Sequence, residues 1–173
     1  MKSLIKKFET KKYLLALLAV SFLGMFNSLY LTYLHFSSEA NSFCNFGERF
    51  NCEVVNSSSY SEMFGVPIAF LGFTMFLVLG LMTIYASENT SKRKITVQII
   101  SVMLFFGFIY SIYLVYIQKF VLKTYCTFCI VLDILILLAL ILSIIALGSI
   151  KIDHEAKNEK EYRDSVNISE DVS

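Results

Sequence analysis

The 173-residue sequence has no tryptophan, a single proline and few charged residues. Only 17% of its residues are Asp, Glu, Lys or Arg, whereas 56% are hydrophobic. This balance is too apolar for an ordinary soluble domain of the same length, so the expected solvent is a lipid bilayer. The basic residues lie beside apolar runs and not along a folded face, which argues against a nucleic-acid partner.

Four apolar stretches are long enough to cross the hydrocarbon core of a bilayer, which takes about 20 helical residues. They lie near residues 13–36, 64–86, 95–117 and 126–150. Each is predicted to be a helix, because an open strand would leave backbone groups unpaired in lipid and the runs lack the alternation of a barrel strand. The predicted fold is all-α: a bundle of four transmembrane helices forming one membrane domain, residues 13–150.

The placement of lysine and arginine predicts how the chain crosses the cell membrane, plasma or inner. Five lysines lie within residues 1–12, and Lys92, Arg93 and Lys94 join the second span to the third. By the positive-inside rule both segments face the cytoplasm. The polar tail, residues 151–173, then returns to the cytoplasm and is expected to be solvated and partly disordered.

The outer loop, residues 37–63, is the longest link between spans, and loops of this length are usually functional. Part of it is expected to be helical. The sequence Ser59-Tyr60-Ser61-Glu62 fits a capping box ahead of Phe64-Gly65-Val66-Pro67. Pro67 then suits the first turn of the second membrane helix.

All four cysteines are predicted to lie on the outer face, where disulfides persist. Cys44 and Cys52 are separated by seven residues in the outer loop, and Cys126 and Cys129 form a C-x-x-C where the chain re-enters the membrane. A helix N-terminus lowers the pKa of the first thiol of such a motif. Cys129 lies one turn deeper, within reach of a molecule dissolved in the bilayer. The two pairs could therefore form an electron relay, which requires the loop to fold back until Cys52 is near Cys126.

Two other uses of four outer cysteines remain open. Two static disulfides could staple the outer loop of a non-catalytic membrane protein. A zinc site is the other, although its ligand pairs usually repeat a short spacing and one spacing here is seven residues. A haem attachment is excluded, because it needs a histidine directly after the second cysteine and Ile130 stands there.

The order of these motifs resembles the vitamin K epoxide reductase family, in its prokaryotic branch. It runs from the separated pair through a serine-rich segment and Phe64-Gly65-Val66-Pro67 to Cys126-Thr127-Phe128-Cys129. The similar DsbB family has its C-x-x-C first and its separated pair later, so the order here favours the epoxide-reductase family. The resemblance implies a four-helix bundle around a quinone of the ubiquinone or menaquinone type.

The resemblance also implies a route for electrons. Cys44 would face the thiols of an extracytoplasmic thioredoxin-fold protein, Cys52 would pass electrons to Cys126, and Cys129 would contact the quinone. The implied function is disulfide bond formation outside the cytoplasm, with reduction of vitamin K or its epoxide as the alternative. Many prokaryotic members carry a fused thioredoxin-like domain of about 100 residues. The tail here is too short for one, so the partner is expected to be a separate protein.

Ser58 and Asp133 are supporting candidates. Ser58 matches a serine that the family places beside the active disulfide, although a serine in a triple-serine stretch is equally a turn residue. Asp133 stands where the animal enzymes have a tyrosine that contacts the quinone. It lies one helical turn below Cys129, where it could deliver a proton or pair with a polar neighbour. Asn27 and Gln98 are predicted to tie helices together by hydrogen bonds.

Overall fold

The computed structural model describes the backbone of residues 2–37 and 50–171, and the side chains of residues 10–37 and 50–151. Cys44 therefore lies outside the described residues. The long helices are α1 (Lys2–Phe36), α3 (Ile68–Glu88), α4 (Arg93–Tyr116) and α5 (Thr127–Asp171). The shorter elements are α2 (Cys52–Asn56), β1 (Glu62–Met63), β2 (Val66–Pro67) and the π-helical turn η1 (Ile117–Leu122), which continues α4.

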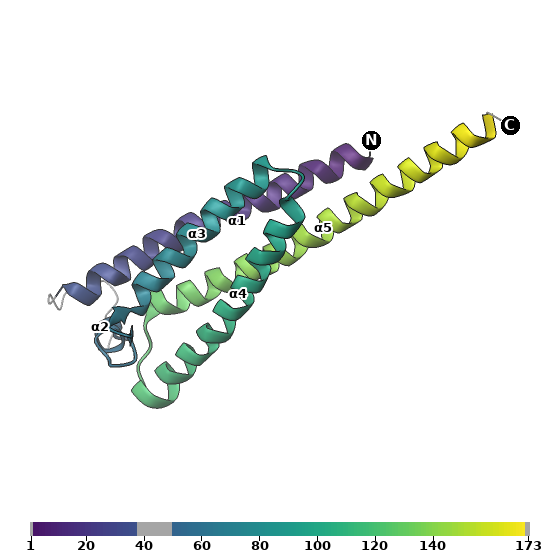
Figure 1. The fold of residues 1–173 in the computed structure, drawn as a ribbon. Coiled ribbons are helices and arrows are strands. Elements are labelled where there is room, and N and C mark those ends of the chain that lie inside the picture. The colour runs from purple at the N-terminus through teal and green to yellow at the C-terminus, as the bar shows by residue number, and fades with distance from the viewer. Residues whose placement is uncertain (1, 38–49, 172–173) are drawn as a thin grey trace.

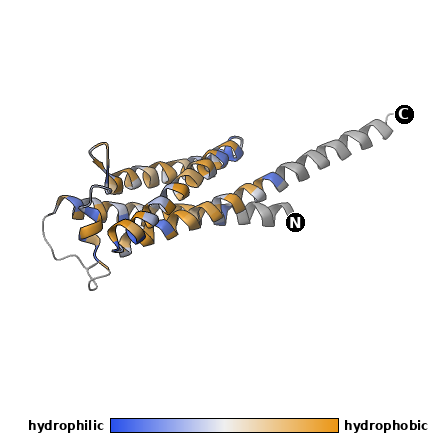
Figure 2. Cartoon of the chain, turned by 90° about the horizontal axis from the view of Figure 1, so that it is seen from below, coloured by the Kyte–Doolittle hydropathy of each residue, from blue (hydrophilic) through white to orange (hydrophobic). Residues whose placement is uncertain are grey.

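Four helical segments are long and apolar enough to cross a membrane: Thr10–Phe36, Ile68–Glu88, Arg93–Leu122 and Thr127–Lys151. Many of their large hydrophobic side chains point outward, including Leu15, Phe26, Phe106 and Ile144. Hydrophobic residues run along the described helices, as Figure 2 shows. An outward apolar face is unfavourable in water but suits lipid, so the prediction of an all-α membrane protein with four spans is confirmed.

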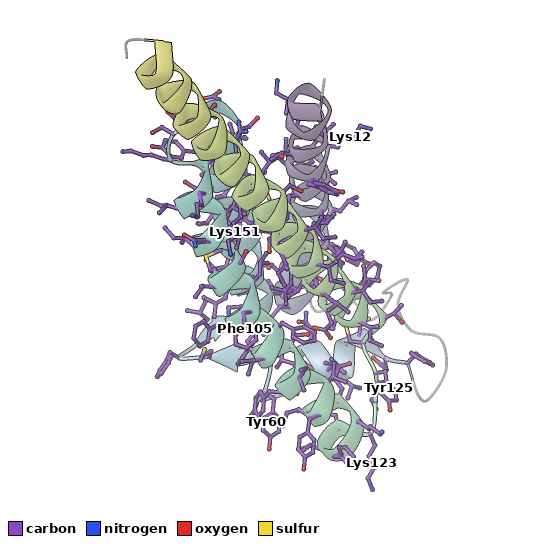
Figure 3. The ribbon with its side chains drawn as sticks, turned by 90° about the vertical axis from the view of Figure 1, so that its right-hand side faces the viewer. Lys12, Tyr60, Phe105, Lys123, Tyr125 and Lys151 are labelled. Atoms are coloured by element: carbon purple, nitrogen blue, oxygen red, sulfur yellow. The ribbon has the colours of Figure 1, made fainter. Side chains whose placement is uncertain are left out.

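The chain places its termini and its cysteine-bearing segments at opposite ends of the bundle (Figure 1). Both termini and the α3–α4 link lie at one end, whereas α2, the β1–β2 hairpin and η1 lie at the other. Lys12 and Tyr125 mark the two ends in Figure 3. This arrangement agrees with the predicted separation of the lysine-rich segments from the C-x-x-C. Which end faces the cytoplasm stays a prediction.

Close packing of α1 against α3 and α5 forms the centre of the bundle. The buried cluster includes Leu17, Phe76, Leu79, Ile100, Leu104 and Ala139. A Cβ atom added at Gly24 would lie 2.5 Å from ring atoms of Phe76, so glycine is what allows α1 and α3 to approach at this point. Asn27 ties α1 to α5, as predicted, because its Nδ2 donates to the carbonyl oxygen of Phe128 at 3.0 Å.

The start of the second membrane helix differs from the prediction. Phe64 (φ 55°) and Gly65 (φ 76°) form the turn of the β1–β2 hairpin, and α3 begins only at Ile68. Pro67 is the N-cap, with φ −58° and ψ 132°, and does not lie in the first helical turn. Two consecutive residues with positive φ are what a tight hairpin needs, and strand pairing here replaces the expected helix start.

The predicted capping box is also wrong, because Ser59 lies in a turn that begins no helix and Glu62 lies in strand β1. The hydroxyl of Ser61 donates to the carbonyl oxygens of Asn56 at 2.6 Å and Ser58 at 2.7 Å. It therefore stabilises the turn after α2 and caps no helix. The loop is nevertheless partly helical, as predicted, because α2 lies within it.

Two further expectations are corrected. Disorder was expected in part of the polar tail, whereas the structure continues α5 as helix to Asp171. The tail contains neither glycine nor proline, so no residue in it strongly opposes helix. Gln98 is exposed on α4, and its side chain makes no hydrogen bond to any described residue, so it ties no helices together.

Candidate functional site

The segment that carries Cys52 is joined to the residue that precedes Cys126. The N–H of Asn51 donates to the carbonyl oxygen of Tyr125 at 3.1 Å, beside an isolated parallel bridge between Phe50 and Tyr125. Asn51 also caps α2, since its Oδ1 accepts from the N–H groups of Glu53 at 3.0 Å and Val54 at 3.2 Å. One residue thus begins α2 and attaches it to the chain that enters α5.

The other end of α2 is attached to α1. Asn56 donates from Nδ2 to the carbonyl oxygen of Leu31 at 2.8 Å, and its own carbonyl oxygen lies 2.7 Å from Nδ1 of His35. Nε2 of His35 lies 3.2 Å from Glu62 of the hairpin. These contacts hold α2 and the hairpin against the C-terminal part of α1.

Cys126 occupies the N-cap position of α5. Its Sγ accepts a hydrogen bond from the backbone N–H of Cys129 at 3.2 Å, as an N-cap side chain does. The pKa of Cys126 is lowered, chiefly by a hydrogen bond from the Cys129 thiol and also by the N–H groups of Cys129 and Phe128, while burial acts in the opposite direction. The position of Cys126 at the start of α5 agrees with the prediction, and its reactivity stays a prediction.

Cys52 and Cys126 share one buried cluster with Leu31 and Val55, and Cys129 packs against it. Cys52 and Cys126 are both 0% exposed. Cys52 is disulfide-bonded, whereas Cys126 and Cys129 are free thiols. The expectation that the outer loop folds back to bring Cys52 near Cys126 is therefore confirmed.

A cavity of about 370 Å³ opens beside Cys129. Residues of α1, α3, α4, η1 and the first turns of α5 line it, together with the end of α2 and the hairpin. Its apolar lining residues include Leu31, Met75, Phe76, Leu122, Leu132 and Ile136. Its polar lining residues are Asn56, Ser58, Tyr60, Ser61, Tyr110, Ser111, Gln118 and Asp133. This size and this mostly apolar lining suit a small hydrophobic ring with a few polar atoms, such as a quinone headgroup.

The structure places the two supporting candidates in the wall of this cavity. Ser58 donates its hydroxyl to the carbonyl oxygen of Val55 at 2.7 Å, which is the turn role weighed for it. Asp133 accepts a hydrogen bond at Oδ1 from Ser111. Its Oδ2 is buried and has no hydrogen-bond partner among the described residues.

Sequence reasoning missed Ser111 and Gln118. Oε1 of Gln118 accepts from the backbone N–H of Cys126 at 2.9 Å, across the η1 turn. A glutamine eight residues before the C-x-x-C, near the C-terminal end of an apolar run, was the available signal. The pairing of Ser111 with Asp133 left no such signal, because it joins two different helices.

Comparison with known proteins agrees with this geometry. No curated protein matches the chain at a significant level. The model of the vitamin K epoxide reductase family matches residues 15–144, a range that holds both cysteine pairs, α2, the hairpin and Asp133. Since this match covers most of the chain, the protein belongs to the vitamin K epoxide reductase family.

Proposed function

We propose that the protein oxidises the thiols of a separate extracytoplasmic thioredoxin-fold protein and passes the electrons to a membrane quinone, so supporting disulfide bond formation. Members of this family are membrane oxidoreductases that use quinone-type electron carriers. The observation that carries the proposal is the position of the thiols. Cys52 and Cys126 lie in one buried cluster, and Cys129 opens into the cavity.

The chemistry balances as two successive exchanges and one reduction. The partner's dithiol reduces the loop disulfide at Cys44 and becomes a disulfide itself. The freed Cys52 thiolate then attacks Cys126 in a Cys126–Cys129 disulfide, and Cys44 resolves the mixed disulfide, so the loop pair is reoxidised. The reduced Cys126 and Cys129 then give two electrons to the quinone and form their disulfide again, while the quinone takes up two protons and leaves as quinol.

Each residue of the C-x-x-C has a physical reason for its place in this order. Cys126, with its lowered pKa, is the better leaving thiolate when Cys44 attacks Cys52 and so resolves the Cys52–Cys126 mixed disulfide. Cys129 lines the cavity and Cys126 does not, so Cys129 is the thiol that meets the acceptor. The free thiols at both positions correspond to the state that donates electrons to the quinone.

The decisive experiment is anaerobic turnover of the purified protein with a reduced thioredoxin-fold protein and excess quinone, followed as quinol. We expect Cys52→Ala to abolish quinol formation with the protein donor and to keep turnover with a small dithiol. Cys129→Ala should abolish both. Because Cys126 is fully buried, the small dithiol should react more slowly than the protein donor does with the wild type.

Two results would contradict the proposal. Absence of quinol from the wild-type protein with both donors would exclude the function. Loss of dithiol-driven turnover in Cys52→Ala as complete as in Cys129→Ala, with both variants folded, would exclude the sequential relay. Structural disulfides would also resist reduction by glutathione, whereas those of a relay would titrate at a higher potential.

A further inference from the structure

Gln118 is a buried polar residue in the wall of the cavity that reaches Cys129. It is 3% exposed and lies in η1, the π-helical turn that continues α4. Such turns are uncommon and are frequent at functional sites. A buried amide in an apolar wall is unfavourable unless its polar atoms find partners.

The hydrogen bond to Cys126 determines which way the amide points. Oε1 accepts from the N–H of Cys126 at 2.9 Å, so the amide nitrogen of Gln118 is the free end. That nitrogen carries two donors, and neither bonds to any described residue. The side chain therefore presents unused donors while its acceptor is engaged.

Few other donors in this cavity are free. Ser58, Ser61 and Ser111 already donate their hydroxyls to protein oxygens. Asn56 uses one of its two amide N–H groups on the carbonyl oxygen of Leu31. The other donors among the lining residues are its second N–H, the amide of Gln118 and the hydroxyls of two tyrosines, of which Tyr60 is exposed and Tyr110 lies about two helical turns deeper on α4. Among them, Gln118 alone is bonded to the C-x-x-C.

We propose that Gln118 binds the quinone directly, by donating a hydrogen bond from its amide nitrogen to a carbonyl oxygen of the headgroup. The inference rests on the proposed function and names a residue that recognises the acceptor. The same side chain holds the N–H of Cys126, so one amide aligns the first turn of α5 and the ring that Cys129 reduces.

The test compares Gln118→Leu and Gln118→Glu with a matched control, Gln98→Leu. Gln98 is an exposed glutamine of α4 whose side chain bonds to no described residue, so the control makes the same chemical change outside the cavity. We expect Gln118→Leu to raise the KM for quinone about three- to tenfold, the loss expected for one neutral hydrogen bond. The KM for the dithiol and all constants of Gln98→Leu should stay near wild type.

Gln118→Glu separates direct binding from a purely structural role. It keeps an acceptor for the N–H of Cys126 but replaces the donating NH2 with an oxygen that donates only when protonated. Quinone binding should therefore be weak at high pH and recover as the pH falls. A structural role predicts no pH-dependent recovery and a quinone KM like that of wild type.

Equilibrium binding of the quinone to protein in nanodiscs, measured on the same variants, keeps this inference distinct from the proposed function. Binding that depends on Gln118, without turnover in the wild type, supports the inference and excludes the function. Turnover with an unchanged KM and an unchanged affinity for quinone in both Gln118 variants overturns the inference and leaves the function standing. Wild-type protein that binds no quinone overturns both. If Gln118→Leu fails to fold, the near-isosteric Gln118→Glu gives the answer.

Discussion

At the scale of single residues, we propose Asp133 as the acid that serves the chemistry at Cys129, because both residues line the same cavity. Quinone reduction takes up two protons, and a positioned carboxyl group can deliver one of them. The buried Oδ2 of Asp133, without a partner among the described residues, is free for this role, and Ser111 holds the other oxygen. We expect Asp133→Asn to slow quinol formation about a hundredfold without weakening the binding of the thiol partner.

The measurement is the rate of quinol formation from about pH 5 to about pH 9, the range over which a catalytic acid shows itself in a rate profile. The variant should lose the pH dependence that the carboxyl group imposes on the wild-type rate. Unchanged turnover across this range would make Asp133 a structural partner of Ser111.

A second prediction at this scale concerns how Cys129 affects the pKa of Cys126. Cys129 supplies the largest effect that lowers the pKa of Cys126, through the hydrogen bond of its thiol. Cys129→Ala should therefore raise the pKa of Cys126 and reduce its thiolate fraction at neutral pH. Cys129→Ser, which keeps a hydroxyl donor, should shift the pKa less.

The rate of alkylation of Cys126 by iodoacetamide, measured against pH in a background lacking Cys44 and Cys52, reports the pKa. Its midpoint should move to higher pH in Cys129→Ala. Coinciding profiles for the Ala and Ser variants would show that the thiol hydrogen bond is not what activates Cys126.

At the scale of elements, the contact between α1 and α3 depends on a glycine. Gly24→Ala would place a Cβ atom 2.5 Å from the ring of Phe76, which is 1% exposed and cannot move freely. The variant should be destabilised by about 1–3 kcal/mol, the usual cost of forcing a methyl group into a packed core. Unfolding in mixed micelles measures the loss.

Gly148→Ala is the matched control for this change. No heavy atom lies within 4 Å of a Cβ built at Gly148, so the variant should be as stable as the wild type or slightly more stable. Equal losses in the two variants would show that the effect is one of helix backbone and not of packing.

At the scale of the whole molecule, the direction of insertion decides whether the cysteines meet an oxidising partner. Lys92 lies in the link at the end of the bundle that holds both termini, and Lys123 follows η1 at the opposite end. In a cysteine-free background, Lys123→Cys should react with an impermeant maleimide on intact cells. Lys92→Cys should react only after permeabilisation, because the positive-inside rule keeps its segment in the cytoplasm.

Both lysines are exposed, so a failure of a cysteine at either position to react means that the membrane, and not burial in the protein, keeps the maleimide away. Labelling of Lys92→Cys on intact cells would reverse the orientation. It would place Cys52 and Cys126 in a reducing compartment, where the proposed role in disulfide formation could not operate.

The four spans and the position of the C-x-x-C could be predicted because their signals are local. In lipid each backbone must satisfy its own hydrogen bonds, so long apolar runs must be helices whatever surrounds them. Cys126 as the N-cap of α5 follows equally from its place at the start of such a run. The order of the cysteine pairs, likewise a property of the sequence, was enough to indicate the family that residues 15–144 match.

The sequence by itself therefore determined the membrane fold, the family and the identity of the candidate thiols. Only the tertiary structure decided what surrounds them: the burial of Cys52 with Cys126, the bond from Cys126 to Gln118, and the pairing of Ser111 with Asp133. The hairpin turn at Phe64 and Gly65 was also decided by the tertiary structure, since the local pattern favoured a capping box at residues 59–62 and a helix from Phe64. Each of these features depends on the packing of segments distant in sequence or on strand pairing, and such contacts leave no periodic signal in either segment alone.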